Sequence, residues 1–197
     1  MAKVLVVYGS RHGGTRGIAE RIGEVLRSDG LEAVVSDAAA APSTDGFDAF
    51  VVGSGVYLGA WLKEATSFLE REATRLAGRP VYLFSSGPLP GSTRSAKTAD
   101  VEPLEESLGP VAGPGSGGRR KVEELSALVR PREHRVFLGA FDPSDPPRTI
   151  VERVVRLVPA PKKILPAGDF REWEVIEAWA HEIAREVARG FAVAVAV

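Results

Sequence analysis

Residues 3–15 read KVLVVYGSRHGGT, and this stretch decides the fold. Its first half, from Lys3 to Tyr8, is a continuous apolar run rich in valine, which is typical of a strand buried on both faces of a sheet. Gly9 and Ser10 interrupt the run, and Thr15 opens a segment with apolar residues at helical spacing. The stretch therefore predicts a buried strand, a glycine-containing turn and a helix in direct succession.

The rest of the chain continues this alternation of buried strands and amphipathic helices. We predict further strands over 31–36, 48–54, 80–86 and 135–140, and helices over 62–76, about 122–129 and about 172–189. Such alternation implies an α/β fold in which helices cover both faces of a parallel sheet, with right-handed crossovers.

The C-terminal third carries the clearest helix signals. Asp169, followed three residues later by Glu172, resembles a capping box, and Gly190 is expected to end the helix. Trp173 and Trp179 lie on its apolar stripe and are expected in the core. We expect one domain over 1–190, with a Gly/Pro-rich surface loop near 111–119 and an apolar tail of unassigned role over 191–197.

Composition excludes several classes of function. With 25 basic and 26 acidic residues the net charge is −1, so no overall field favours nucleic acid. The chain has no cysteine, which rules out disulfides, thiolate catalysis and cysteine metal sites, and three histidines alone make a metal site unexpected. No run approaches the roughly 20 apolar residues of a membrane span. We expect a cytoplasmic protein.

The turn after the first strand has the features of a phosphate cradle. A strand that runs into a glycine-containing turn and a helix aims free backbone N–H groups and the helix dipole at one point, so an anion binds there without a lysine. Gly13 and Gly14 can take the positive φ that such a turn needs, while Ser10 and Thr15 can add hydroxyl donors. Two further residues of the turn, Arg11 and His12, meet either the phosphate or solvent.

Competing nucleotide motifs fit less well. A nucleoside-triphosphate loop needs a lysine after its last glycine, and here Thr15 follows Gly14 directly. The dinucleotide fingerprint is absent from the turn, and the looser glycine pattern of Gly53, Gly55 and Gly59 lacks the acidic residue of a ribose site. This leaves a single phosphate, or a tight turn without any ligand.

Three loops then carry a family resemblance. The pattern from Ser10 through Gly13 to Thr15 resembles the phosphate loop of flavodoxins. Residues 53–63, GSGVYLGAWLK, resemble the loop after the third strand of flavodoxin domains, and residues 85–88, SSGP, stand at the loop after the fourth. Together with residues 139–141 and 169–173, their spacing over roughly 1–90 and 134–189 is similar to the menaquinone-dependent protoporphyrinogen dehydrogenase branch.

The resemblance implies a flavodoxin-like three-layer sandwich with five parallel strands in the order 2-1-3-4-5, and flavin mononucleotide (FMN) as cofactor at the carboxyl ends of the strands; flavodoxin is itself a standard example of this rule. By position, the phosphate would be held by Ser10, Arg11, His12, Gly13, Gly14 and Thr15. One flank of the flavin ring would be formed by Ser54, Gly55, Val56, Tyr57, Leu58, Gly59 and Trp61, and the other edge by Ser86, Gly87 and Pro88. Alternatively, Trp61 packs the following helix against the core.

The resemblance leaves more than one function open. The chain is either an FMN oxidoreductase that passes electrons from a reduced substrate to a quinone-type acceptor, as a protoporphyrinogen dehydrogenase does, or an electron-carrier flavodoxin whose partner is a redox protein; a binding module without flavin is a third option. The near-neutral charge favours the enzyme, because carriers are commonly acidic. Residues 142–147, DPSDPP, depart from the more basic, aromatic-rich stretch of the protoporphyrinogen branch.

One basic segment bears on that choice. Residues 147–166 hold five basic side chains and one glutamate among apolar positions at helical spacing. The segment is expected either to contact an anionic membrane at its surface, where a lipid quinone resides, or to pack on the sheet with a solvated basic face.

Overall fold

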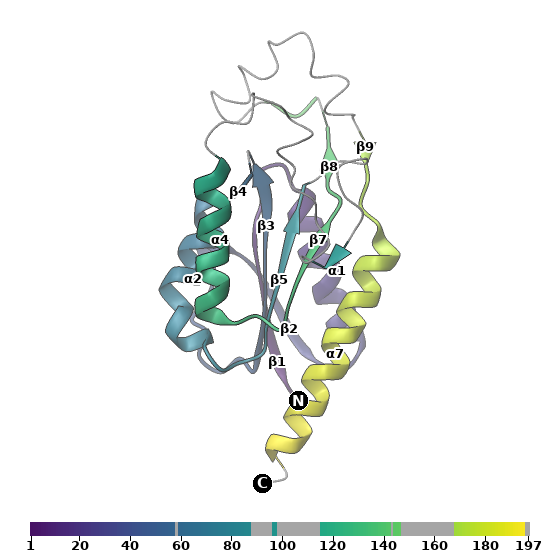
Figure 1. Cartoon of the computed structure of the whole chain (residues 1–197). Helices are drawn as coiled ribbons and strands as arrows, with labels where there is room; N and C mark the ends of the chain where they lie inside the picture. The colour runs from purple at the N-terminus through teal and green to yellow at the C-terminus, as the bar shows by residue number, and fades with distance from the viewer. Residues whose placement is uncertain (58, 88–95, 98–114, 143, 147–167, 196–197) are drawn as a thin grey trace.

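A five-stranded parallel sheet forms the centre of the protein (Figure 1). The computed structural model describes residues 1–57, 59–87, 96–97, 115–142, 144–146 and 168–195. The parallel strands are β1 (Lys3–Gly9), β2 (Glu32–Asp37), β3 (Ala49–Tyr57), β5 (Val81–Ser86) and β7 (Glu133–Phe137). They lie in the order β2-β1-β3-β5-β7, which confirms the predicted order, and the short antiparallel strand β6 (Ala96–Lys97) pairs with β7.

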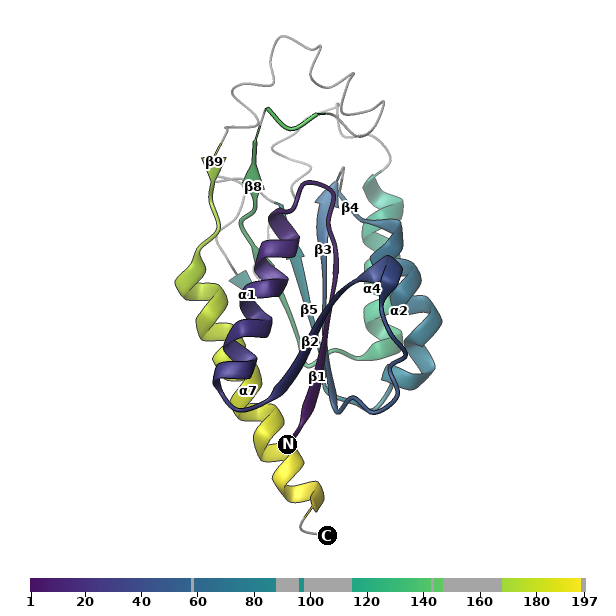
Figure 2. The ribbon, with the colours of Figure 1, turned by 180° about the vertical axis from the view of Figure 1, so that it is seen from behind.

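Helices cover both faces of this sheet and complete the predicted three-layer sandwich (Figures 1 and 2). One face carries α1 (Gly14–Ser28) and α7 (Trp173–Val195), and the other carries α2 (Lys63–Leu76), α4 (Gly115–Val129) and the short 3-10 helix η1 (Ala38–Ala40). Alternate residues of β1 supply both cores: Val4 and Val6 face α1 and α7, while Leu5 and Val7 face α2. Burial of both faces explains the unbroken apolar run in the sequence.

Aromatic side chains fill the core beneath α7. Trp179 is fully buried, and its ring lies 5.4 Å from Phe137, 6.2 Å from Phe84 and 6.5 Å from Tyr82, measured between ring centroids. Trp173 packs against the rim of the same core. Both tryptophans therefore take the structural role expected of them.

The last parallel strand differs in its bounds from the prediction. It was expected over 135–140, but β7 ends at Phe137 because its pairing with β5 runs from Tyr82–Glu133 to Ser86–Phe137. Beyond Gly139 the chain starts a second, two-stranded sheet, in which β8 (Ala140–Phe141) pairs with β9 (Gly168–Asp169). We call this pair the β8–β9 ribbon.

Both ends of α7 differ from the prediction. Asp169 does not cap the helix, because it lies in β9 and its carboxylate accepts hydrogen bonds from Arg171; α7 begins at Trp173, and the amides of Val175 and Ile176 bond to the Glu172 carbonyl. The helix also passes through Gly190 to Val195. A helical glycine costs only about 1 kcal/mol relative to alanine, and Phe191, the next residue, packs against the core.

The remaining expectations concern the long connections. Of the Gly/Pro-rich stretch near 111–119, residues 115–119 belong to the first turns of α4, and the others lie outside the described residues. Residues 147–166 also lie outside them. Within the described parts of the chain, no helix has the length and apolarity that a membrane crossing requires.

Candidate flavin site

The loops that leave the carboxyl ends of the strands converge on one place. A Cβ atom added at Gly55, near the end of β3, would stand 3.1 Å from the hydroxyl of Thr15 and 2.9 Å from the ring of Tyr57. On the other side of β3, Gly139 approaches Gly87 so closely that an added Cβ would lie 3.1 Å from the Gly87 Cα atom. The glycines at this edge thus let Thr15, Tyr57 and the loops after β5 and β7 approach the ends of the strands closely.

The turn after β1 has the expected geometry of an anion cradle. Gly13 adopts a left-handed conformation with φ of 82°, and the first helical hydrogen bond of α1 runs from the amide of Gly17 to the carbonyl of Gly13 at 2.9 Å. The amides of Gly14, Thr15 and Arg16 therefore lack helical partners. Gly14 itself does not have the positive φ that we expected, because it is already the first helical residue.

Two buried hydroxyl groups at this edge have no hydrogen-bond partner among the described residues. Thr15 is 4% exposed and Ser86 is 3% exposed, yet neither hydroxyl takes part in a hydrogen bond within the part of the chain that the structure describes. An unsatisfied buried polar group costs about 1–3 kcal/mol, so native proteins rarely leave one without a reason. A polar ligand that bonds to both loops would satisfy them, and the residues present therefore fit a flavin nucleotide.

The neighbouring serines are satisfied by the protein instead. The hydroxyl of Ser54 accepts a hydrogen bond from the amide of Leu62 and donates one to the carbonyl of Gly55, both at 2.9 Å. Leu62 is the N-cap residue of α2 and has no side-chain cap of its own. Ser54, which we expected at the cofactor, thus fixes the start of α2 with its side chain.

The two aromatic candidates of the flavin loop have different surroundings. Trp61 belongs to the two-residue strand β4 (Ala60–Trp61), is 7% exposed, and packs in the core beneath α2 and α4. It therefore takes the core position that we gave as the alternative. Tyr57 is half-buried at the site, where the guanidinium of Arg11 lies 4.8 Å from its ring centroid and the ring of His12 lies 6.3 Å away.

Trp61 belongs to a hydrogen-bonded group that sequence reasoning missed. Its indole N–H donates to the hydroxyl of Ser85 at 2.8 Å, and that hydroxyl lies 2.9 Å from Nε2 of His134. Burial lowers the pKa of His134 to about 4, so the ring is neutral at pH 7. The Ser85 hydroxyl therefore links the indole of Trp61 to the neutral ring of His134. We call Trp61, Ser85 and His134 the interior network.

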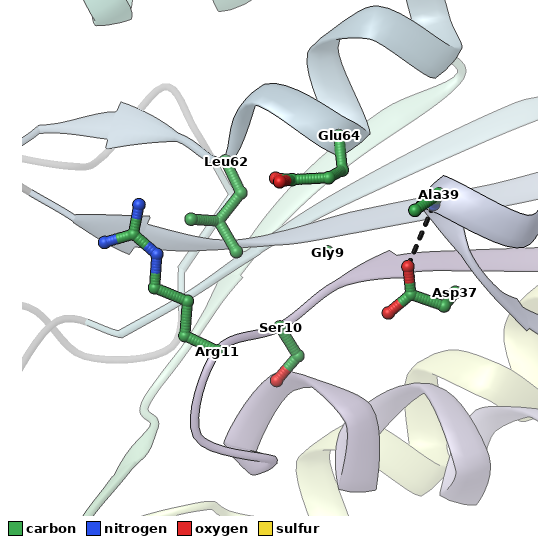
Figure 3. A pocket seen from close by; sticks show the side chains of 7 residues that line it. All are labelled: Gly9, Ser10, Arg11, Asp37, Ala39, Leu62 and Glu64. Carbon is green, nitrogen blue, oxygen red and sulfur yellow. Dashed lines mark hydrogen bonds between the residues drawn. The ribbon is translucent and has the colours of Figure 1, made fainter. Parts of the chain in front are cut away.

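A cavity of about 220 Å³ adjoins the turn at 10–15, on the side of β2 and α2 (Figure 3). It lies where β1 and β2 end and α2 begins, and its lining residues are Gly9, Ser10, Arg11, Asp37, Ala39, Leu62 and Glu64. The carboxylate of Glu64 points into it, and that of Asp37 accepts a hydrogen bond from the Ala39 amide (Figure 3). Two carboxylates beside the turn disfavour a second phosphate, which agrees with a mononucleotide.

The β8–β9 ribbon contributes contacts that the sequence did not reveal. An added Cβ at Gly14 would lie 3.5 Å from the Ala140 amide nitrogen, and Arg171 donates to the Gly14 carbonyl at 3.3 Å. No local sequence pattern predicts this contact, because Arg171 lies 157 residues further along the chain than Gly14. Of the other expected site residues, Val56 lies beside Gly87 and Gly59 has φ of 74° in the β3–β4 hairpin; Leu58 and Pro88 lie outside the described residues.

Together, these features define a nucleotide-binding α/β protein with its site at the carboxyl edge of the sheet. The sequence model of the flavodoxin domain family matches residues 5–144, so the chain belongs to that family. Membership implies FMN as the cofactor, and the buried hydroxyls of Thr15 and Ser86, without partners among the described residues, fit that group.

Solved structures support the fold. A mutant flavodoxin from Pseudomonas aeruginosa is 18% identical, with 94% of this chain and 99% of that chain covered and a TM-score of 0.52. The flavodoxin of Streptococcus pneumonia TIGR4 is 16% identical over the same shares, with a TM-score of 0.55. Rubredoxin oxygen:oxidoreductase from Desulfovibrio gigas is 14% identical, with a TM-score of 0.56; the match covers 96% of this chain but only 37% of that larger protein.

Proposed function

We propose that this protein is an FMN-dependent oxidoreductase that passes electrons from a reduced small-molecule substrate to a quinone-type acceptor, as in the protoporphyrinogen dehydrogenase branch. The observation that supports FMN most directly is the pair of buried hydroxyls of Thr15 and Ser86, neither of which bonds to a residue that the structure describes. They lie on either side of β3, and a ligand that extends across the carboxyl ends of the strands would satisfy both.

In this proposal each loop has a separate task. The amides of Gly14 and Thr15 and the Thr15 hydroxyl bind the phosphate, and Gly87 lets the polar edge of the ring approach the backbone. Tyr57 covers one face of the ring and excludes water from it. Bound FMN supplies the electron-accepting and electron-donating chemistry, while the protein positions it and sets its electrostatic surroundings.

The charge of the chain favours an enzyme over an electron carrier. A carrier that must find basic partner proteins gains from a strongly acidic surface, because complementary charge steers the encounter. This chain has a net charge of −1. The carrier is the second candidate, and membership in the flavodoxin domain family is the observation that favours it.

Turnover separates the two candidates. The purified, FMN-loaded protein is mixed without oxygen with menadione and either NADH or protoporphyrinogen as donor, and the reduction of menadione is followed. An enzyme gives steady turnover with one donor that greatly exceeds free FMN at the same concentration. Turnover no faster than free FMN, with rapid single-step electron exchange with a redox protein, would favour the carrier.

A peripheral membrane contact through 147–166 is part of the quinone proposal, because the acceptor would reside in the lipid. It rests on five basic residues against one acidic residue in that segment. Flotation of the protein with liposomes that contain anionic lipid tests it, with neutral liposomes as the control. Absence of the protein from the floating fraction in both cases would exclude this contact.

A further inference from the structure

Residues on both sides of the β8–β9 ribbon contact the turn at 10–15 or the loop after β7. On the side of β8, the backbone of Ala140 packs on Gly14, and the carboxylate of Asp145, just beyond the strand, lies 3.5 Å from Nδ1 of His12. On the side of β9, the amide of Phe170 bonds to the carbonyl of Gly139 at 3.1 Å. The ribbon is thus attached to the turn and to the loop after β7 together.

Arg171 makes the most specific of these contacts. Its guanidinium forms a two-pronged ion pair with Asp169, from Nε at 2.8 Å and from Nη2 at 2.6 Å, and Nη1 reaches the carbonyl of Gly14 at 3.3 Å. The group lies 4.4 Å from the ring centroid of Trp173, and the side chain is only 17% exposed. Three sides of the guanidinium are therefore held, and its position is fixed.

The surroundings of Arg171 leave it little freedom to move. A Cβ atom at Gly17 would collide with Nη1, so the absence of a side chain on α1 is what lets the guanidinium lie against the helix. The ion pair with Arg171 lowers the pKa of the Asp169 carboxyl, so the pair stays ionised at neutral pH. Because Asp169 neutralises it, Arg171 affects the turn by holding a peptide in place rather than by its net charge.

We propose that Arg171 is a positioning residue for the FMN phosphate, an inference that rests on the proposed function. By holding the carbonyl of Gly14, it fixes the peptide between Gly14 and Thr15, and the N–H of that peptide, which belongs to Thr15, is part of the anion cradle. Without Arg171 the first turn of α1 loses a tertiary hydrogen bond, and its amides no longer point at one place. Binding of the phosphate weakens, while contacts to the flavin ring stay as they are.

A comparison of two ligands tests this role. FMN and riboflavin share the ring and the ribityl chain, and only FMN carries the phosphate. For Arg171→Gln we expect the Kd of FMN to rise about tenfold, the scale of one hydrogen bond from a charged donor, and the Kd of riboflavin to stay within about twofold. Fluorescence quenching of the flavin measures both.

Arg21→Gln is the matched control. Arg21 of α1 likewise holds a carboxylate with two nitrogens, since its Nε and Nη2 lie 2.8 and 2.7 Å from Oε1 of Glu177 in α7, but it does not touch the turn. This variant should leave both dissociation constants within about twofold. If Arg171→Gln fails to fold, Arg171→Lys, which keeps the charge and loses the fork, is measured against the same outcomes.

The inference is overturned if the Arg171 variant weakens both ligands equally or weakens neither. Those results differ from failure of the proposed function, in which the wild-type protein itself binds no FMN. A loss confined to FMN in the Arg171 variant, with Arg21→Gln unchanged, supports the positioning role.

Discussion

Ser85 and Ser86 are neighbours at the end of β5, both are buried, and yet their hydroxyls have opposite roles. Ser85 faces the core beneath α2 and α4, where the interior network with Trp61 and His134 satisfies it. Ser86 faces the loop after β7 and, like Thr15 across β3, has no hydrogen-bond partner among the residues that the structure describes. Successive residues of a strand point to opposite faces, so one residue separates a structural hydroxyl from one available to a ligand.

The largest expected effect comes from removing the indole of Trp61 from the interior network. Trp61→Ala should lower the free energy of unfolding by about 3–5 kcal/mol, because it opens a cavity and leaves Ser85 without a donor. Chemical denaturation of the FMN-free protein measures this loss. A loss below about 1 kcal/mol, together with a large drop in FMN affinity, would instead place Trp61 on the flavin.

Acid should weaken the interior network through His134. The pKa of this ring falls from 6.5 in the unfolded chain to about 4 in the folded one, so the unfolded state binds the proton first as the pH falls. Stability is therefore complete above pH 6.5 and is lost progressively towards pH 4, by up to about 3 kcal/mol.

The matched variant for this pH dependence is His134→Gln, which cannot be protonated. Denaturation of both proteins between pH 7 and pH 4 should show a steeper loss in the wild type, so that their difference in stability shrinks as the pH falls. A constant difference over that range would mean that His134 does not stay neutral in the folded state.

On the ligand side, Thr15→Val should separate binding from folding. The change keeps the shape of the side chain and removes the hydroxyl, so FMN affinity should fall by about 1.5–3 kcal/mol, the range for a hydrogen bond to a charged group. The FMN-free protein should be as stable as before or more so, because an unpaired buried hydroxyl is gone. Reduced stability with unchanged affinity would show that the hydroxyl serves the fold.

The smallest effects should come from Ser85 and Ser86. One substitution should lower stability, and the other should lower FMN affinity. Ser85→Ala should cost about 1–2 kcal/mol of stability with little effect on FMN. Ser86→Ala should leave the stability of the FMN-free protein within about 0.5 kcal/mol and weaken FMN severalfold. Denaturation and fluorescence titration of both variants check this, and the same pattern in both would remove the distinction between the two sides.

The sequence was enough to predict the architecture and the turn at 10–15. It was not enough to predict which side chains of the loops turn into the core. The valine-rich run and the glycines at 9 and 13 each carry a local physical signal, so the buried strand and the cradle followed from them. The strand order followed from the resemblance to flavodoxins. Trp61 lies in the two-residue strand β4, which is too short for a periodicity to show that its side chain turns into the core. The hydrogen bond from Leu62 to Ser54 spans the β3–β4 hairpin and has no local pattern in the sequence. Arg171 had no signal, since its contact with Gly14 exists only once α7 has packed on α1.

The most direct test of the account is a titration of the full-length protein with FMN and, in parallel, with riboflavin, followed by flavin fluorescence and the visible spectrum. We predict one FMN bound per chain, with an affinity at least about tenfold above that for riboflavin, because the cradle binds the phosphate with several donors. Failure to bind FMN, or equal affinity for the two ligands, would contradict the assignment of the turn at 10–15 as the phosphate site.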